Sequence, residues 1–339
     1  MARRDEPTLR GGALKQRPSG SGLRIAFVGC VSEGYKSLEH LLRRGELVLS
    51  VFTLREDLAA GVSGAMRFDE LAARHEVPLV KVQNINDEDN VDRIRALSPD
   101  LVLVIGWTQL VKPPILRIPR YGCIGFHASL LPRYRGRAPV NWAIIRGETR
   151  TGNTMIQLAD GIDDGDILAQ REIPIGFEDT CATVYDRVAE TEFEMLDEVL
   201  PMIRDGRVVR RKQDPADATI MPRRRPEDGQ IDWGQSAVDI YNWVRALTHP
   251  YPGAFTYLGS AKVFVWKASL ASSSPGLLSP GQTRAVEAGL FVGTGSGSLL
   301  LDRVQEDGEA EISGQEFAAR QLGDGTTMFH DPTRNGGTA

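Results

Sequence analysis

Two short stretches of this 339-residue sequence combine residue types that can move protons. His127 follows an apolar run that predicts a buried strand, so its imidazole is expected at the rim where the strand ends. An imidazole titrates near neutral pH and can pass protons during a reaction. Asp163 lies in a glycine-flanked loop between two predicted strands, and a carboxylate opposite an imidazole orients it. The pattern predicts an acid–base site built on His127 and Asp163.

The loop after His127 carries three arginines, Arg133, Arg135 and Arg137, which alternate with Tyr134 and Gly136. Guanidinium groups bind phosphate and carboxylate groups through paired hydrogen bonds, so this loop is a candidate for binding an anionic substrate. Each signal also has a plainer interpretation. A lone histidine is often structural, arginines can form a solvated surface, and the Asp-rich stretch 160–166 can be a hairpin turn or a weak calcium site.

The elements around these residues follow a βαβ pattern. Strands are predicted at 23–29, 47–53, 79–82 and 101–105. Helical spacing lies between them at 37–42 and 66–75, and a third helix follows a turn at 84–87 and continues to about residue 97. This alternation predicts a doubly wound parallel α/β sheet, which binds ligands at the carboxyl ends of its strands. The run after the first strand is Gly-Cys-Val-Ser-Glu-Gly rather than GxGxxG, which argues against a dinucleotide site.

A second, smaller domain is predicted after a long amphipathic helix at 182–204. A helix near 236–247 and short strands at 254–257, 262–269, 290–292 and 299–304 are typical of a small β-barrel. The predicted organisation is a disordered tail at 1–22, an α/β domain at 23–204, a linker at 205–219, a barrel domain at 220–318 and a flexible tail at 319–339.

Composition narrows the functional class. The net charge of −5 argues weakly against a protein built mainly to hold nucleic acid. Three widely spaced cysteines form no CxxC pair, which argues against a disulfide framework or a common zinc site and favours a reducing, cytoplasmic location. The sequence has no apolar run near the ~20 residues that a membrane span needs, and its polar first residues do not form a signal peptide.

The segments HASLLPRYRG (127–136) and DGIDDGDIL (160–168), in that order, resemble the formyltransferases that use 10-formyltetrahydrofolate. The resemblance covers roughly residues 23–317 and implies a Rossmann-like catalytic domain followed by an OB-like barrel. It implies that His127 is the catalytic histidine and Asp163 the catalytic aspartate, and that no metal is needed. It also implies that Asp163, together with a bound water, deprotonates the amine that receives the formyl group.

The resemblance also implies binding residues. The segments around residues 105–110 and 160–163 would hold the folate, which assigns Gly106, Trp107, Gln109, Leu110, Asp160, Gly161 and Asp163. The loop after the histidine would hold the acceptor, which assigns Ser129, Arg133, Arg135, Arg137 and Asn141. Relatives that act on sugar nucleotides are often dimers, so a homodimer is a further expectation.

One position departs from the family pattern. Two residues before the histidine the family usually has Asn, whose side chain helps to hold the oxyanion, whereas this sequence has Gly125. Loss of one such donor can slow a reaction by about 10²–10³ when nothing replaces it. An active enzyme with a substitute donor is expected, and a non-catalytic folate-binding relative is the alternative.

The acceptor expected from the resemblance is the amine of an amino-sugar nucleotide. Residues 135–142 resemble the matching loop of formyltransferases that act on UDP-4-amino-4-deoxy-L-arabinose. Methionyl-tRNA is considered unlikely, because residues 206–317 contain 12 Lys and Arg against 13 Asp and Glu, and residues 55–67 form no basic insertion. An amino acid such as hydroxyornithine, or the amine of an antibiotic, is a third possibility.

Overall fold

The computed structural model describes residues 22–271, 276–287, 289–321 and 327–330. Most of the tail predicted at 1–22 lies outside these ranges, as does much of the tail predicted at 319–339.

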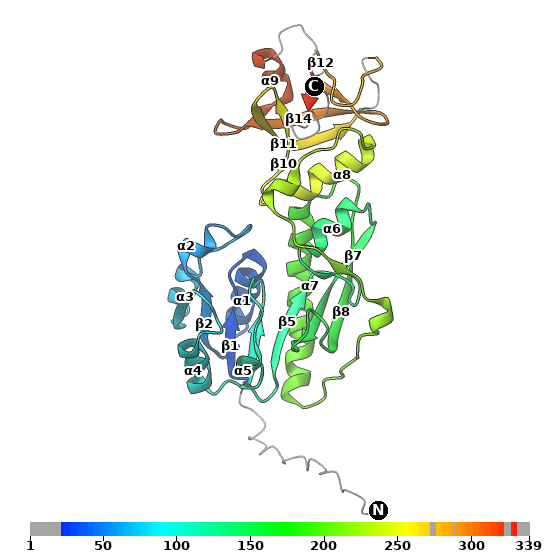
Figure 1. Cartoon of the computed structure of the whole chain (residues 1–339). Coiled ribbons are helices and arrows are strands. Elements are labelled where there is room, and N and C mark those ends of the chain that lie inside the picture. Colours follow the sequence, from blue (N-terminus) through cyan, green and yellow to red (C-terminus); the bar gives the residue numbers. More distant parts are fainter. Residues whose placement is uncertain (1–21, 272–275, 288, 322–326, 331–339) are drawn as a thin grey trace, which may run out of the picture.

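A seven-stranded sheet forms the framework of the N-terminal half (Figure 1), with the strand order β3-β2-β1-β4-β5-β7-β8. Its strands are β1 (Ile25–Val28), β2 (Val48–Leu54), β3 (Leu79–Val82), β4 (Leu101–Val104), β5 (Cys123–His127), β7 (Arg150–Gln157) and β8 (Ile167–Pro174). Strands β1 to β5 run parallel, whereas β7 and β8 are antiparallel to their neighbours. Apolar residues fill β1 and β4 completely, because both faces of this sheet are covered.

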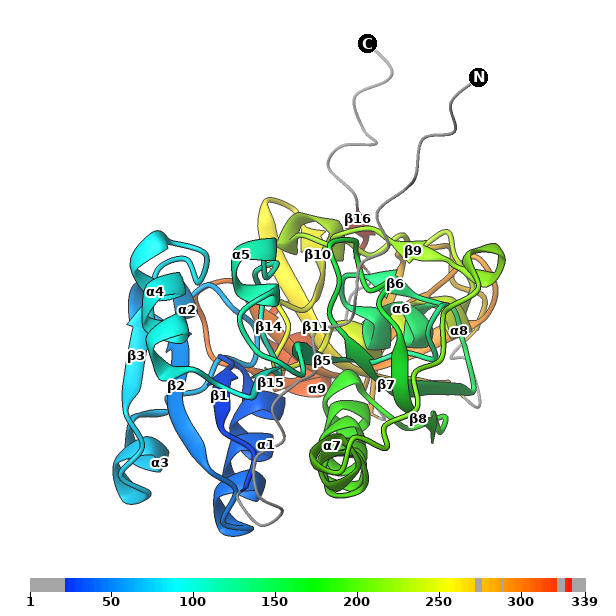
Figure 2. The ribbon, with the colours of Figure 1, turned by 90° about the horizontal axis from the view of Figure 1, so that it is seen from below.

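Helices cover both faces of the sheet (Figure 2). One face holds α1 (Ser32–Arg43), α3 (Asp69–Arg74) and α7 (Cys181–Arg204), and the other holds α4 (Glu88–Leu97) and α5 (Pro113–Leu116). Alternate residues of β1 enter the two cores, Ile25 and Phe27 on one side and Ala26 and Val28 on the other. The short α2 (Glu56–Ala59) follows β2. The predicted doubly wound α/β fold is confirmed.

The C-terminal half is an antiparallel sheet that closes on itself, which confirms the predicted barrel. Its order is β12-β13-β14-β11-β10-β16, with β15 paired to β14. The strands are β10 (Ala254–Leu258), β11 (Ala261–Leu270), β12 (Thr283–Val286), β13 (Gly289–Gly293), β14 (Ser298–Glu306), β15 (Ile312–Ser313) and β16 (Phe329–His330). Closure comes from Thr283 N–H, which donates to the Thr327 carbonyl at 2.8 Å, and from Phe329 N–H, which donates to the Gly281 carbonyl at 2.8 Å.

Part of the predicted C-terminal tail therefore belongs to the barrel. Phe329 is only 2% exposed and stacks on Trp233. Helix α9 (Gly314–Gln321) also extends past the predicted end of the domain and packs on β13 and β14. Strands β12, β15 and β16 and helix α9 were not predicted, because these elements are short and have no clear periodicity.

Two further helices join the halves of the molecule. Helix α6 (Pro139–Ile145), which the sequence analysis did not predict, packs against α7 and against α8 (Ala237–Leu247). One continuous apolar core extends from α6 and the beginning of α7 through α8 into the barrel. Figure 1 shows the barrel at one end of the molecule, beyond α8.

The segment predicted as a linker is not a free connection. It contains the short 3-10 helix η1 (Pro215–Asp217) and returns along the α/β domain. Arg211 exchanges two backbone hydrogen bonds with Ile167, and β9 (Ile220–Met221) pairs with β6 (Arg135–Gly136) in the loop after β5. The segment thus lies against both loops that carry the predicted chemistry. Within the described residues, no helix has the length and apolarity to cross a membrane.

Candidate active site

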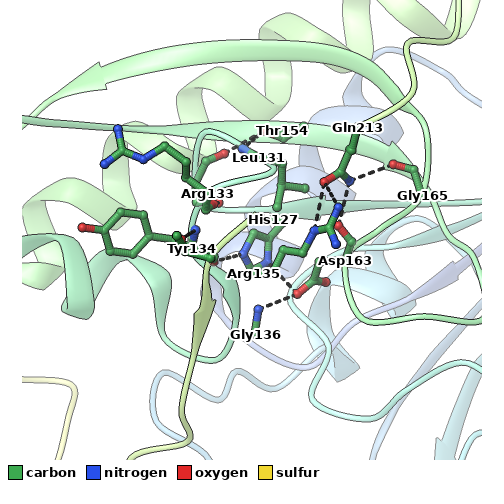
Figure 3. Close-up of polar contacts among 12 residues, drawn as sticks. His127, Leu131, Arg133, Tyr134, Arg135, Gly136, Thr154, Asp163, Gly165 and Gln213 are labelled. Atoms are coloured by element: carbon green, nitrogen blue, oxygen red, sulfur yellow. Dashed lines mark hydrogen bonds and ion pairs between the residues drawn. The ribbon is translucent and has the colours of Figure 1, made fainter. Parts of the chain in front are cut away.

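His127 is the last residue of β5, which lies between β4 and β7. It is only 8% exposed, and both ring nitrogens face polar groups (Figure 3). Nε2 lies 2.7 Å from the Tyr134 carbonyl oxygen, and Nδ1 lies 3.5 Å from Oδ2 of Asp163. A carbonyl can only accept, so Nε2 carries a hydrogen and donates it, which leaves Nδ1 as the nitrogen that can gain or lose a proton.

Asp163 approaches from the loop between β7 and β8. Its Oδ2 accepts a hydrogen bond from Gly136 N–H at 2.9 Å, so the loop after the histidine also contacts the carboxylate. Asp163 has a positive φ of 50°, and Tyr134 and Ala138 have φ values of 60° and 50°. Three residues other than glycine, one of them Asp163 itself, thus have left-handed backbones in the two loops that carry the contacts of His127 and Asp163. Such backbone strain is found where the surrounding contacts enforce it.

Gln213, a residue of the linker that sequence reasoning missed, connects the two loops (Figure 3). Its Nε2 donates to the carbonyl oxygens of Asp163, at 2.7 Å, and Gly165, at 2.8 Å. Its Oε1 accepts from Nε and a terminal nitrogen of Arg135, at 3.1 and 2.7 Å. No local pattern marks this glutamine, because it is separated by 50 residues from Asp163.

Two residues predicted to bind the acceptor are buried structural residues instead. Ser129 is 0% exposed, and its hydroxyl donates to the Arg133 carbonyl at 2.7 Å. Asn141 is 1% exposed, and its Nδ2 donates to the Ala246 carbonyl of α8 at 2.6 Å. Ser129 therefore stabilises the loop and Asn141 joins α6 to α8, so neither side chain reaches a substrate in this arrangement.

The three arginines of this loop have different environments. Arg135 is held by Gln213 and does not project into solvent as a free cation. Arg133 is exposed, 3.5 Å from Glu148, and Arg137 is exposed. Arg133 and Arg137 thus remain candidates to contact an anionic acceptor.

The segment predicted to line the folate pocket is a tight loop after β4. Gly106 has φ 61°, and a Cβ there would lie 2.6 Å from Cγ2 of Val31, so only glycine fits. The Gln109 side chain accepts from Ile85 N–H at 2.9 Å and donates to the Gln83 carbonyl at 2.8 Å, so it anchors this loop to the turn before α4. Trp107 is partly exposed, and Leu110 is 65% exposed.

Asp160 and Gly161 lie on the exposed tip of the loop before Asp163. A Cβ on Gly161 would meet the carboxylate of Asp164, at 1.9 Å, and that exposed side chain can rotate away. The described part of the chain contains no group of three or more His, Cys, Asp or Glu that could hold a metal ion.

Gly125 lies two residues before His127 on the same face of β5, and its surroundings explain the missing side chain. A Cβ at this position would lie 2.9 Å from Cδ2 of Leu158 and 3.2 Å from the Val104 carbonyl oxygen. Leu158 thus occupies the space beside the strand into which a side chain at position 125 would extend.

Comparison with known proteins identifies both halves. Residues 23–200 match the family model for "Formyl transferase", and residues 223–322 match that for its C-terminal domain. A methionyl-tRNA formyltransferase of Geobacter sulfurreducens is 37% identical over 303 residues, which is 88% of this chain and 94% of that protein. The methionyl-tRNA formyltransferase of Geobacter metallireducens is 39% identical over 88% of this chain and 96% of its own length.

Solved structures share the fold at lower identity. HypX from Aquifex aeolicus, in complex with tetrahydrofolic acid, has a TM-score of 0.62 and 20% identity, and the match covers 88% of this chain and 47% of HypX. An N-formyltransferase from Helicobacter canadensis, in complex with folinic acid and dTDP-3-aminofucose, has a TM-score of 0.63 and 17% identity over 84% of this chain and 99% of its own. At these identities the likeness carries the fold and not the substrate.

These relatives overturn two expectations from the sequence: an amino-sugar nucleotide as the acceptor, and tRNA as an unlikely partner. The structure explains why the signals misled. In the loop that suggested a sugar nucleotide, Arg135 is bound by Gln213 and Asn141 is buried. The nearly balanced charge of residues 206–317 as a whole concealed a local excess of positive charge. Residues 207–225 contain seven Lys and Arg against two Asp.

Proposed function

Since the chain belongs to the formyl transferase family, we propose that it transfers the formyl group of 10-formyltetrahydrofolate to the amino group of methionine carried on tRNA. The single observation that carries this proposal is the 36–39% identity to methionyl-tRNA formyltransferases along 88–92% of the chain. The facing His127 and Asp163 supply the acid–base chemistry that the transfer requires.

The acceptor amine attacks the formyl carbon in its neutral form. A bond forms between the amine nitrogen and that carbon, the carbonyl oxygen becomes an oxyanion, and the bond to N10 of the folate then breaks. The amine loses one proton and N10 gains one, so protons balance within the site. His127 Nδ1 and the Asp163 carboxylate, 3.5 Å apart, are placed to accept the first and return the second.

The pair divides this work by its hydrogen bonds. The Tyr134 carbonyl holds a hydrogen on Nε2 and fixes the plane of the imidazole. A positive charge that forms on the ring during the transfer lies opposite the Asp163 carboxylate and stabilises the oxyanion electrostatically in a site with little exposure. Gly125 offers no side chain for that oxygen, so in this proposal His127 carries a larger share of the stabilisation.

Exposed cations of the linker and of the residues directly after β9 support a tRNA acceptor. Arg210, Lys212, Arg223 and Arg225 are exposed and flank Gln213 and β9, which contact the loops of the catalytic pair. Lys and Arg side chains along a surface bind the phosphate backbone of nucleic acids and make binding depend on salt. These four cations thus offer phosphate contacts next to the site where the aminoacyl end of the tRNA must react.

The test is a transfer assay with the purified chain, 10-formyltetrahydrofolate and tRNA charged with methionine, read by mass spectrometry of the released amino acid. Formylmethionine should form with the wild-type chain and not with His127→Ala. Parallel reactions contain uncharged tRNA, free methionine and hydroxyornithine. Formylation of a free amine in preference to methionyl-tRNA, or no product with any acceptor, would contradict the proposal.

A further inference from the structure

We infer that Gln213, a residue of the interdomain linker, is a positioning residue for the catalytic pair. It holds the Asp163 loop in a strained conformation that sets the carboxylate against His127. This inference rests on the proposed function for its kinetic consequence, whereas its structural consequence can be measured without any acceptor. Gln213 contacts neither ring nitrogen of His127 nor the Asp163 carboxylate.

The strain of the loop creates the need for such a residue. Asp163 adopts a left-handed φ of 50°, which an Asp tolerates better than most residues but still adopts at a cost. Of the neighbouring glycines, Gly165 is buried and tightly packed, since a Cβ there would lie 1.7 Å from the Gln157 carbonyl oxygen, whereas Gly161 lies on the exposed tip of the loop. With a glycine two residues before Asp163 at this exposed tip, a loop held by no outside contact could relax the left-handed residue and rotate its side chain away from the imidazole.

Gln213 opposes that relaxation from outside the loop. One amide nitrogen donates to two carbonyl oxygens, those of Asp163 and Gly165, at 2.7 and 2.8 Å. These bonds fix the peptide plane that follows Asp163 and the one that follows Gly165, and so hold both ends of the two-residue segment 164–165. The Asp163 carboxylate itself is bound by Gly136 N–H at 2.9 Å, and the side chain is 25% exposed, so the side chain alone is weakly confined.

The other end of Gln213 faces the loop of the histidine. Its Oε1 accepts two hydrogen bonds from Arg135, whose backbone N–H donates to the Thr219 carbonyl at 2.8 Å. The adjacent Tyr134 N–H donates to Oγ1 of Thr219 at 2.8 Å, and the Tyr134 carbonyl accepts from His127. One glutamine therefore connects the backbone of the aspartate loop to the loop that fixes the imidazole.

Two substitutions separate the two halves of this interaction. Gln213→Met keeps the size of the side chain and removes every hydrogen bond. Gln213→Glu keeps an acceptor for Arg135, and strengthens that bond with a charge, but it cannot donate to the carbonyls of Asp163 and Gly165. If the hydrogen bonds donated to the aspartate loop position the carboxylate, Gln213→Glu should lose as much activity as Gln213→Met. Gln315→Met, which alters an exposed glutamine of α9, is the matched control.

The experiment measures kcat and KM for both substrates, and hydrogen exchange by mass spectrometry for the peptide that spans 159–168. In Gln213→Met and Gln213→Glu we expect kcat to fall about 10- to 100-fold, the range for small misplacements of catalytic groups. KM for the folate should stay within about twofold, and exchange in 159–168 should rise at least about threefold while the strands of the sheet stay protected. The control should match the wild-type chain.

The outcomes are separable. Wild-type kcat in Gln213→Glu, with a loss only in Gln213→Met, would show that the bond to Arg135 suffices and would overturn the inference. A fall in melting temperature with increased exchange in the strands of the sheet would assign Gln213 a general structural role and would also overturn it. If the wild-type chain forms no formylmethionine, the proposed function fails, and the exchange of residues 159–168 alone decides on Gln213.

Discussion

His127 and Asp163 face each other across 3.5 Å, yet the chain positions them in different ways. His127 ends a strand paired on both sides, with Gly125 opposite Val104 on β4 and His127 opposite Thr154 on β7, so the register of the sheet fixes its place. Asp163 lies on a strained loop that a distant glutamine holds. A catalytic pair can thus combine one residue positioned by regular structure with one positioned by long-range hydrogen bonds.

Substitution of His127 or of Asp163 itself should have the largest effect. His127→Ala and Asp163→Asn should each lower kcat by at least about 10²-fold, the scale of lost general acid–base catalysis. The double substitution should be little worse than either single one, because residues that act as a unit are not additive. Steady-state kinetics on methionyl-tRNA measures this. Near-wild-type turnover in both single variants, or fully multiplicative losses, would contradict the paired role.

The basic segment of residues 207–225, which includes the linker beside the Asp163 loop, offers a second test, which changes binding rather than chemistry. Replacing Arg210, Lys212 and Arg223 by Glu should weaken tRNA binding at least about tenfold. It should also reduce the dependence of log Kd on log salt, by about one for each phosphate that the chain no longer neutralises. Filter binding at several salt concentrations measures both quantities. The kcat at saturating tRNA should stay close to that of the wild-type chain.

A change of three arginine residues elsewhere controls for net charge. Arg43, Arg74 and Arg95 are exposed and lie on α1, α3 and α4. Their replacement by Glu should leave tRNA binding nearly unchanged. An equal loss of affinity in the two triple variants would mean that the total charge of the chain, rather than the cations at positions 210, 212 and 223, sets the affinity for tRNA.

The sequence predicted the strands that position His127 well, and it predicted the contacts of the loops around Asp163 poorly. Apolar runs placed β1, β3 and β4 within a few residues, and the motif of residues 127–136 located the histidine at a strand end. Burial of Ser129 and Asn141 could not be predicted, because Ser129 is buried by the folding back of its own loop and Asn141 by the packing of α6 on α8. Gln213 carried no local signal, because its partners are distant in sequence.

The packing of β5, the strand that carries His127, can be tested at Gly125. Gly125→Asn should displace Leu158, whose Cδ2 would lie 2.9 Å from the new Cβ, and should destabilise the fold by about 1–3 kcal/mol, as overpacking does. Thermal unfolding measures this as a lower melting temperature, by roughly 2–4 °C per kcal/mol for a domain of this size. Gly125→Asn combined with Leu158→Ala should recover most of the loss. An unchanged melting temperature in Gly125→Asn alone would mean that Leu158 moves without cost.

A buried polar contact between α1 and α7, which includes neither His127 nor Asp163, should change stability and leave turnover unaffected. Glu192 of α7 is 2% exposed, and its Oε2 accepts from the Ser37 hydroxyl of α1 at 2.6 Å. The pKa of the Glu192 carboxyl is raised from 4.5 to about 8, mainly by burial and also by the nearby Glu33, against the opposing effects of the bonds from Ser37 and Asn153 and of the charge of Lys36. The folded chain therefore retains a proton that the unfolded chain releases above about pH 4.5.

Stability should accordingly fall as the pH rises from about 4.5 towards 8, by at most ~1.4 kcal/mol per pH unit, and should level off above that range. Glu192→Gln keeps an acceptor for Ser37 without a titrating proton, so the variant should lose most of this dependence while its kcat stays unchanged. Glu190→Gln, at an exposed position of the same helix, should retain it. Urea unfolding at pH 5.5, 6.5 and 8 measures the slope. Equal slopes in the wild-type chain and Glu192→Gln would assign the proton to another group, of which Glu33 is the first candidate, because burial raises its pKa as well.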